Sequence, residues 1–243
     1  MNNILKRIAL ANRNLAILID PEKMKVDAIS AFAKAVMPTI STLENQLQID
    51  QFYFLVGGST MENVDFEKWI ITLKENTHIP IVIFPGSSKQ LSEDAHGILF
   101  LNLLSGRNPE YLVEQQLQAA QKLKNTSLEV LPTGYLLLDG GKETAVQRIS
   151  RTKPLNQNQI STIVNHAYAA QLMGNRLIYL EAGSGATHPV SAEIVHEVSK
   201  QINIPLIVGG GLRTMHQIEE TFNAGAKMVV IGTAIEEDIS WNG

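Results

Sequence analysis

The 243-residue chain is 44% hydrophobic and 18% charged, with a formal net charge of −4 at pH 7. This length suits one α/β barrel domain, and the scattered lysines and arginines exclude the basic surface typical of nucleic-acid-binding proteins. The chain has no cysteine, which excludes disulfides, a thiolate nucleophile and zinc held by cysteine.

The N-terminal stretch 1–14 lacks the long apolar segment of a signal peptide. No apolar run elsewhere reaches the roughly 18 residues that a membrane-spanning helix needs. We therefore expect a cytoplasmic protein without a transmembrane segment.

Eight short apolar runs rich in Val, Ile and Leu recur along the chain. Continuous runs of this kind are typical of parallel strands that are buried on both faces. The predicted strands cover 15–20, 51–58, 79–84, 97–104, 134–139, 175–182, 204–210 and 227–232.

Amphipathic stretches separate these runs and predict helices. The first covers 26–47 and contains Pro38, so we expect a kink or two shorter helices there. Asn108 and Pro109 predict the start of a later helix, and Gly174 predicts the end of another. The other predicted helices lie near 64–75, 109–123, 157–173, 190–200 and 214–224.

Eight strands that alternate with helices predict a single (β/α)8 barrel domain covering 1–243. A doubly wound open sheet is the alternative, because the same alternation builds it. Two segments depart from an ideal barrel. Residues 85–97 are too few and too polar for a helix with two loops, and 140–155 are predicted to form a strand extension or an irregular excursion.

The residues after each strand mark the expected site, because the active site of a barrel forms at the carboxyl ends of its strands. Gly209, Gly210 and Gly211 follow the seventh run, and Gly232 and Thr233 follow the eighth. Both loops open a helix, which favours a phosphate site built from backbone N–H groups. The alternative is that these glycines only end the strands.

Asp20, at the end of the first run, is a candidate Mg²⁺ ligand, because this cation prefers carboxylate and hydroxyl oxygens and retains waters while it binds phosphates. Ser59 or Thr60, one strand along, offers a neighbouring hydroxyl oxygen. The alternative, an Asp20 that only caps a turn before Pro21, fits the sequence equally well.

Glu181 ends the sixth run, directly before the glycine loop 183–185. This loop lacks the third glycine of a dinucleotide-binding fingerprint. Residues 141–144 resemble the end of a P-loop, but leucine occupies the place of its first glycine. His188 is the only histidine retained as a candidate, although a loop residue before Pro189 is the more ordinary interpretation.

Together, five motifs resemble the geranylgeranylglyceryl phosphate synthase family and follow its order over nearly the whole chain. They are LIDPEK (18–23), VGGST (56–60), YLEAGSGA (179–186), VGGGLRT (208–214) and IGTAIEE (231–237). One branch of the family has lysine two residues before the first-strand aspartate. Leu18 stands here, so the chain is similar to the archaeal-type branch and its bacterial relatives, and phosphate neutralisation is left to backbone donors and Lys23.

The resemblance implies a modified (β/α)8 barrel whose third helix is replaced by an irregular segment. It implies Mg²⁺-dependent transfer of a prenyl group, with geranylgeranyl the family default, from its diphosphate to the C3 hydroxyl of sn-glycerol 1-phosphate in ether-lipid synthesis. Asp20 and Ser59 would be the metal ligands. The implied glycerol 1-phosphate site comprises Tyr179, Leu180, Glu181, Ala182, Gly183, Ser184, Gly185, Gly210, Gly211, Gly232 and Thr233.

In the expected mechanism, Glu181 accepts a hydrogen bond from the glycerol hydroxyl and orients it or takes its proton. Tyr179 positions the glycerol or the carbon that gains cationic character. Apolar residues near Phe84 and at 99–104 are expected to line a groove for the lipid chain. The family also implies a homo-oligomer, and the lipid product implies transient contact with membranes.

Two other functions remain open. A sugar-phosphate isomerase or an indole-type synthase would need a second acid or base, and the sequence offers only Asp20 or Asp139 as a partner for Glu181. A non-catalytic barrel that binds a phosphorylated metabolite would keep the glycine loops, but the presence of Asp20, Ser59 and Glu181 together argues against lost chemistry.

Overall fold

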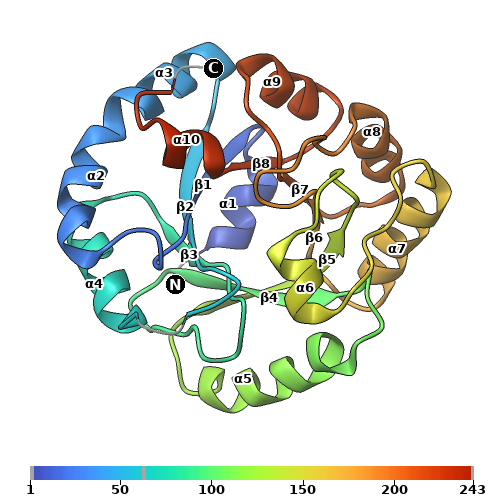
Figure 1. Ribbon diagram of the computed structural model, residues 1–243, viewed down its shortest axis with the longest axis horizontal. Coiled ribbons are helices and arrows are strands. Elements are labelled where there is room, and N and C mark those ends of the chain that lie inside the picture. The colour runs from blue at the N-terminus through green and yellow to red at the C-terminus, as the bar shows by residue number, and fades with distance from the viewer. Residues whose placement is uncertain (1–2, 62–63, 242–243) are drawn as a thin grey trace.

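In the computed structural model, which describes residues 3–61 and 64–241, eight parallel strands form a closed barrel surrounded by helices (Figure 1). The strands are β1 (Asn14–Ile19), β2 (Gln51–Val56), β3 (Ile81–Ile83), β4 (Gly97–Leu103), β5 (Glu129–Leu137), β6 (Leu177–Glu181), β7 (Leu206–Gly209) and β8 (Met228–Ile231). Because β1 pairs with both β2 and β8, the predicted barrel is confirmed and the open sheet is wrong.

The α-helices are α1 (Ile4–Leu10), α2 (Ile29–Ala35), α3 (Met37–Leu47), α4 (Phe66–Asn76), α5 (Gln115–Leu123), α6 (Ala145–Ser150), α7 (Ile160–Leu172), α8 (Ala192–Gln201), α9 (Met215–Asn223) and α10 (Thr233–Glu237). A 3-10 turn, η1 (Val26–Ala28), precedes α2, and a π-helical turn, η2 (Glu110–Glu114), precedes α5. Within the described residues, no helix is long and apolar enough to cross a membrane.

Each strand buries both faces, because successive side chains alternate between the barrel interior and the surrounding helices. In β6, Leu177 and Tyr179 pack inside the barrel, whereas Ile178 and Leu180 join the core between the sheet and the helices. The alternation sets the direction of the next residue, Glu181. Its carboxylate therefore points into the barrel mouth rather than into the outer core.

Helix α1 closes the amino end of the barrel and lies inside the ring of strands in Figure 1. Ile4 and Ile8 are buried among the interior side chains. The Glu129 carboxylate, at the start of β5, accepts hydrogen bonds from the N–H groups of Ile4 and Leu5 at 2.5 and 2.9 Å. With one end closed, access to the interior is from the carboxyl ends of the strands.

Several local signals are confirmed. The stretch around Pro38 forms separate helices α2 and α3, with the proline in the first turn of α3. Gly174 follows α7 with φ of +96°, a conformation that suits glycine. The predicted helix start at Asn108 is confirmed, because Asn108 Oδ1 accepts a hydrogen bond from Glu110 N at 3.1 Å. The first turn of this helix is the π-helical turn η2.

The irregular segment predicted after β3 is also confirmed, because the described residues between β3 and β4 contain no helix. The buried side chain of Gln90 anchors it: Nε2 donates to the Gly58 carbonyl at 2.8 Å, and Oε1 accepts from Gly86 N at 3.0 Å. The segment therefore leaves that side of the barrel uncovered by a helix.

Two predictions made from the sequence differ from the structure. Residues 140–155 contain helix α6, whose first turn is capped by Thr144 through a hydrogen bond from Gln147 N. Strand β5 begins at Glu129 rather than at 134, and it includes Pro132. Proline is unusual inside a strand because it lacks the N–H donor.

Candidate active site

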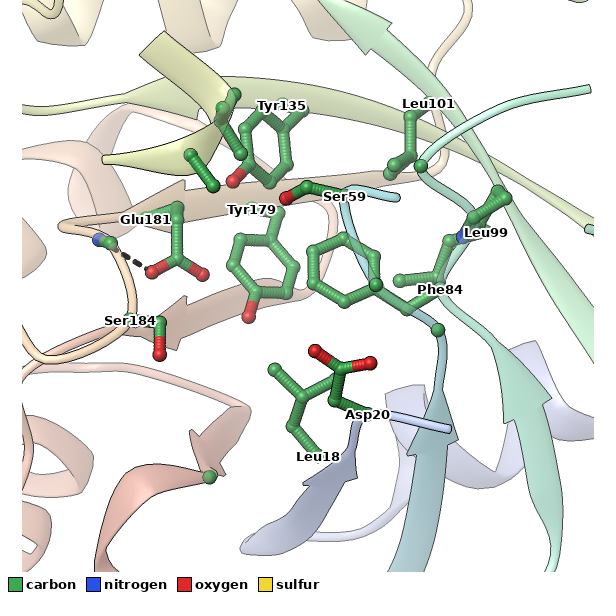
Figure 2. A pocket seen from close by; sticks show the side chains of 18 of the residues that line it. Leu18, Asp20, Ser59, Phe84, Leu99, Leu101, Tyr135, Tyr179, Glu181 and Ser184 are labelled. Atoms are coloured by element: carbon green, nitrogen blue, oxygen red, sulfur yellow. Dashed lines mark hydrogen bonds between the residues drawn. The ribbon is translucent and has the colours of Figure 1, made fainter. Parts of the chain in front are cut away.

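A cavity opens at the carboxyl ends of the strands, where barrel enzymes have their active sites. Figure 2 shows Glu181 and Ser184 on one side of it, Leu99 and Leu101 on the other, and Tyr179 between them. The cavity thus has a polar end and an apolar end. The predicted site residues that line it are Asp20, Ser59, Tyr179, Glu181, Gly183, Ser184, Gly185, Gly210, Gly211, Gly232 and Thr233.

Glu181 is the buried acid of the polar end. Its Oε1 accepts a hydrogen bond from Gly183 N at 2.6 Å, which fixes the side chain under the glycine loop. Burial raises the pKa of Glu181 from 4.5 to about 7, and the contacts with Gly183 and Tyr179 only partly oppose this effect. A carboxyl group with this pKa is able to accept a proton at neutral pH.

Tyr179 lies at the junction of the polar and apolar ends. Its ring stacks on Phe84 and tilts against Tyr135, with centroid separations of 5.3 Å in both pairs. Burial, followed by the negative charge of Glu181, raises the pKa of Tyr179 well above its ordinary value. The hydroxyl therefore keeps its proton.

The Tyr179 hydroxyl lies beside the Glu181 carboxylate, but no hydrogen bond of normal geometry joins it to a described residue. Both groups lie against Gly209, where an added Cβ would be 2.5 Å from Tyr179 Oη and 3.2 Å from Glu181 Oε2. Only glycine leaves room for them. A buried donor without a partner next to a buried carboxylate is suited to contact a polar substrate.

The glycine loops after β6 and β7 form one wall of the polar end. Their backbone is left-handed, with φ of +100° at Gly183, +67° at Gly185, +89° at Gly210 and +73° at Gly211. The Ser184 and Thr233 hydroxyls lie 3.3 Å apart and join this wall to the loop after β8. Free backbone N–H groups in such loops bind anions.

Asp20 and Ser59 face the cavity from the loops after β1 and β2 (Figure 2). Asp20 Oδ1 accepts a hydrogen bond from Glu22 N at 3.0 Å, and burial raises its pKa. Thr60, the other hydroxyl considered, instead donates to Glu22.

One carboxylate and one hydroxyl fit Mg²⁺, which commonly binds through one or two carboxylates, waters and substrate phosphates. In the described part of the chain, no group of three or more His, Asp or Glu side chains is placed to hold a metal ion. A metal at Asp20 and Ser59 stays a prediction.

Several other candidates have structural contacts. Lys23 pairs with Glu236 at 2.7 Å, and Arg213 pairs with Glu237 at 2.9 Å. His188 packs against Gly141, where an added Cβ would lie 2.8 Å from its ring. Its position matches the ordinary loop interpretation.

Two residues of the predicted substrate set, Leu180 and Ala182, do not line the cavity. Both side chains are fully buried in the core between the sheet and the helices. Their place follows from strand alternation, because each neighbours a residue that faces the barrel mouth. They can therefore hold Tyr179 and Glu181 in position, but their side chains cannot reach a ligand.

Other cavity residues were not predicted from the sequence. Tyr135 lines the cavity from β5, and Val146 and Ile149 of α6 cover it. Two features of the sequence could have pointed to these residues: the position of Tyr135 within an apolar strand, and the threonine that caps α6. Neither signal indicated which face would meet the cavity.

Comparison with known proteins gives consistent results. The PcrB family model matches residues 10–242. A geranylgeranylglyceryl phosphate synthase from Zunongwangia profunda is 45% identical over 236 residues, which cover 97% of this chain and 96% of that protein. A protein of the same name from Korarchaeum cryptofilum is 35% identical over 233 residues, covering 96% of this chain and 91% of that protein.

A solved structure agrees with these relatives. The (S)-3-O-geranylgeranylglyceryl phosphate synthase from Thermoplasma acidophilum, in complex with sn-glycerol 1-phosphate, superposes with a TM-score of 0.84 at 31% identity. The match covers 99% of this chain and 92% of that chain. The chain therefore belongs to the PcrB family, together with proteins named geranylgeranylglyceryl phosphate synthase.

Proposed function

We propose that the protein is a Mg²⁺-dependent prenyltransferase that joins a prenyl diphosphate to the C3 hydroxyl of sn-glycerol 1-phosphate and releases diphosphate. One observation carries this proposal: a single cavity joins glycine loops and a buried carboxylate to an apolar groove. A small polyol phosphate suits the polar end, and a hydrocarbon chain suits the apolar end.

The polar end supports two-ended binding of glycerol 1-phosphate. The loops around Gly185, Gly211 and Thr233 offer backbone N–H groups and hydroxyls to the phosphate. Glu181, under the neighbouring loop, accepts hydrogen bonds from the glycerol hydroxyls. The carboxylate thus meets the uncharged end of the substrate, where it does not repel the phosphate.

Glu181 and Tyr179 act on the transferred atoms. The C3 oxygen attacks the allylic carbon of the prenyl diphosphate, the bond from that carbon to the diphosphate oxygen breaks, and Glu181 takes the hydroxyl proton. With a pKa of about 7, Glu181 is partly ionised at neutral pH and accepts this proton readily. Tyr179 orients the glycerol through its hydroxyl, which lies beside the Glu181 carboxylate, or positions the carbon that gains cationic character.

Asp20 and Ser59 would hold Mg²⁺ across the cavity from Glu181. When bound, this ion neutralises the negative charge that develops on the departing diphosphate. Asp20 is held for this task by its bond from Glu22 N. Asp20 directly follows β1 and lies across the cavity from Glu181, with Tyr179 between them (Figure 2).

The apolar end supports a prenyl chain, with geranylgeranyl the preferred length. The irregular segment after β3 leaves this side of the barrel without a covering helix, and the lining side chains come mainly from β4, α5 and α6. They include Phe84, Leu99, Leu101, Leu103, Tyr111, Ala119, Tyr135, Val146 and Ile149. Each isoprene unit that enters replaces contact with water by contact with apolar side chains.

The isomerase and indole-type alternatives gain no support from the site. Asp139, one of the two acids considered, is exposed, and its Oδ1 accepts a hydrogen bond from Gly141 N at 2.9 Å. It is absent from the cavity lining. Asp20 remains as the second acid or base beside Glu181. The isomerisation of a small sugar phosphate, however, does not use an apolar groove.

The test is incubation with sn-glycerol 1-phosphate, Mg²⁺ and a panel of prenyl diphosphates, with product detection by mass spectrometry. We expect a prenylglyceryl phosphate and one diphosphate per product, with geranylgeranyl diphosphate favoured. Tight binding of glycerol 1-phosphate without product would instead support a non-catalytic barrel. Turnover of a sugar phosphate without diphosphate release would support an isomerase.

We also expect a homo-oligomer and transient contact with lipid membranes. The exposed apolar side chains of Leu172 and Met173 near the end of α7 support surface association. Light scattering of the purified protein tests the first expectation. Co-sedimentation with lipid vesicles, with and without product, tests the second.

A further inference from the structure

A second hollow lies at the outer rim of the polar end, next to the glycine loops. It is lined by Asp20, Lys23, Lys142, Ser184, Gly185, Arg213, Thr233, Glu236 and Glu237, among others. Ser184, Gly185 and Thr233 also line the main cavity. The hollow is therefore the solvent side of the loops that we propose bind the substrate phosphate.

Two of the three cations on this rim are already neutralised, by the Lys23–Glu236 and Arg213–Glu237 pairs. Lys142 forms no ion pair with any residue in 3–61 or 64–241. Its acidic neighbours are engaged elsewhere, because Glu143 pairs with Arg148 and Asp139 accepts a hydrogen bond from Gly141 N.

Lys142 reaches the glycine loop directly. A Cβ placed on Gly185 would lie 3.4 Å from Lys142 Nζ, so the ammonium group is next to the backbone of this residue. The left-handed conformation of Gly185 belongs to the turn that also holds Ser184. A phosphate bound by this turn would be within reach of the lysine.

The loop that carries Lys142 is fixed to the glycine loop by its backbone. The Gly140 carbonyl accepts hydrogen bonds from the N–H groups of Thr187 and His188, at 2.9 and 3.0 Å. Thr144 begins α6 and packs against Gly183. The base of the lysine side chain is therefore held in place even though its end is exposed.

We propose that Lys142 binds the phosphate group of the polyol phosphate substrate and supplies the positive charge that the glycine loops lack. The inference rests on the proposed function, because it takes the ligand of these loops to be a phosphate monoester. It gives a role to residues 141–144, whose resemblance to a P-loop did not identify a nucleotide site. At the β1 position where one branch of the family has a lysine, this chain has the uncharged Leu18. Lys142 would supply a positive charge to the phosphate from the loop after β5 instead.

The experiment compares Lys142→Gln and Lys142→Arg with Lys124→Gln, a change of an exposed lysine at the end of α5. Calorimetry measures the Kd of sn-glycerol 1-phosphate and of inorganic phosphate for each protein at low and high salt. We expect Lys142→Gln to weaken both ligands by about tenfold at low salt and by less at high salt. Lys142→Arg and Lys124→Gln should stay within about threefold of the unchanged protein.

Steady-state rates add a second measure. Lys142→Gln should raise the KM for glycerol 1-phosphate and leave the KM for the prenyl diphosphate and the saturated kcat nearly unchanged. A Kd within twofold of the unchanged protein in Lys142→Gln would overturn the inference, as would a Lys142→Arg variant that binds as weakly as the glutamine variant.

The same measurements separate this inference from the proposed function. Phosphate binding that depends on Lys142 in a protein without prenyl transfer would contradict the proposed reaction but support the lysine. Prenyl transfer whose KM for glycerol 1-phosphate is unchanged in Lys142→Gln would support the proposed reaction but contradict the role of the lysine. An unchanged protein that binds neither ligand would overturn both.

Discussion

Replacing Glu181 by glutamine should stabilise the protein at alkaline pH while it removes activity. Glu181 is only 6% exposed as a residue, and its carboxylate accepts a hydrogen bond from Gly183 N. Glutamine has nearly the same shape, and its Oε1 can accept the same bond. The change therefore removes the charge of a buried group with little effect on packing.

The magnitude follows from the pKa. Because burial raises the pKa of Glu181 from 4.5 to about 7, ionisation is about 3 kcal/mol less favourable in the folded protein than in the unfolded chain. Stability from the protonated form is fully present below about pH 4.5 and is lost as the pH rises through about 7. The stability gain of Glu181→Gln should thus grow from less than about 1 kcal/mol at pH 5 to about 3 kcal/mol at pH 8.

Urea unfolding of both proteins without ligands at the two pH values measures this difference. Glu93→Gln, a change of an exposed acid in the segment after β3, is the control and should give a difference near zero at both. A gain from Glu181→Gln that is equal at pH 5 and pH 8 would refute the assignment of a buried acid with a raised pKa.

The same substitution should lower kcat/KM by about 10²- to 10⁴-fold, the range for loss of a general base. In the unchanged enzyme, kcat/KM should fall as the pH drops below about 7, because protonated Glu181 cannot accept the hydroxyl proton. Near-normal turnover of Glu181→Gln at saturating substrate would remove Glu181 from the chemistry.

Four further substitutions test the metal site, the backbone at two glycines and the apolar end of the cavity. Asp20→Asn should abolish the dependence of the rate on Mg²⁺ and lower the rate at least about 100-fold; an unchanged Mg²⁺ titration would place the metal elsewhere. Gly174→Ala, at φ of +96° with open space around it, should cost about 1–2 kcal/mol in urea unfolding. Gly183→Ala should cost at least about 1 kcal/mol more, because its Cβ would lie 2.1 Å from Thr144 Cγ2, and equal costs would contradict this packing. Ala119→Phe should fill the apolar end and raise the KM for geranylgeranyl diphosphate about tenfold more than that for geranyl diphosphate; equal effects on both would move the groove away from α5.

The barrel and the polar end of its site could be predicted from the sequence because their signals are local. Strands appear as apolar runs, and the residues that follow them, such as Asp20 and Glu181, fall at the barrel mouth in any (β/α)8 arrangement. The loops that contain Gly210 and Gly232 are recognisable in the sequence because they are rich in glycine and directly follow apolar runs. Residue identity and strand order were enough for these parts.

Other features depend on tertiary contacts that no local pattern reveals. Helix α1 is short and is held by packing of Ile4 and Ile8 inside the barrel. Tyr135 lies in a strand that is apolar on both faces, so its direction could not be read from periodicity. The raised pKa of Glu181 comes from burial, and the approach of Lys142 to Gly185 comes from two loops that are distant in the sequence but meet in space.

The central claim is that one polar site binds glycerol 1-phosphate at two ends, with the phosphate on the glycine loops and the hydroxyls at Glu181. A crystal structure of the protein with sn-glycerol 1-phosphate tests it most directly. We expect phosphate oxygens against Gly185, Gly211 and Thr233, and the C3 hydroxyl within hydrogen-bond distance of the Glu181 carboxylate. A reversed ligand, with its phosphate beside Asp20 and its hydroxyls at the glycine loops, would contradict this binding mode.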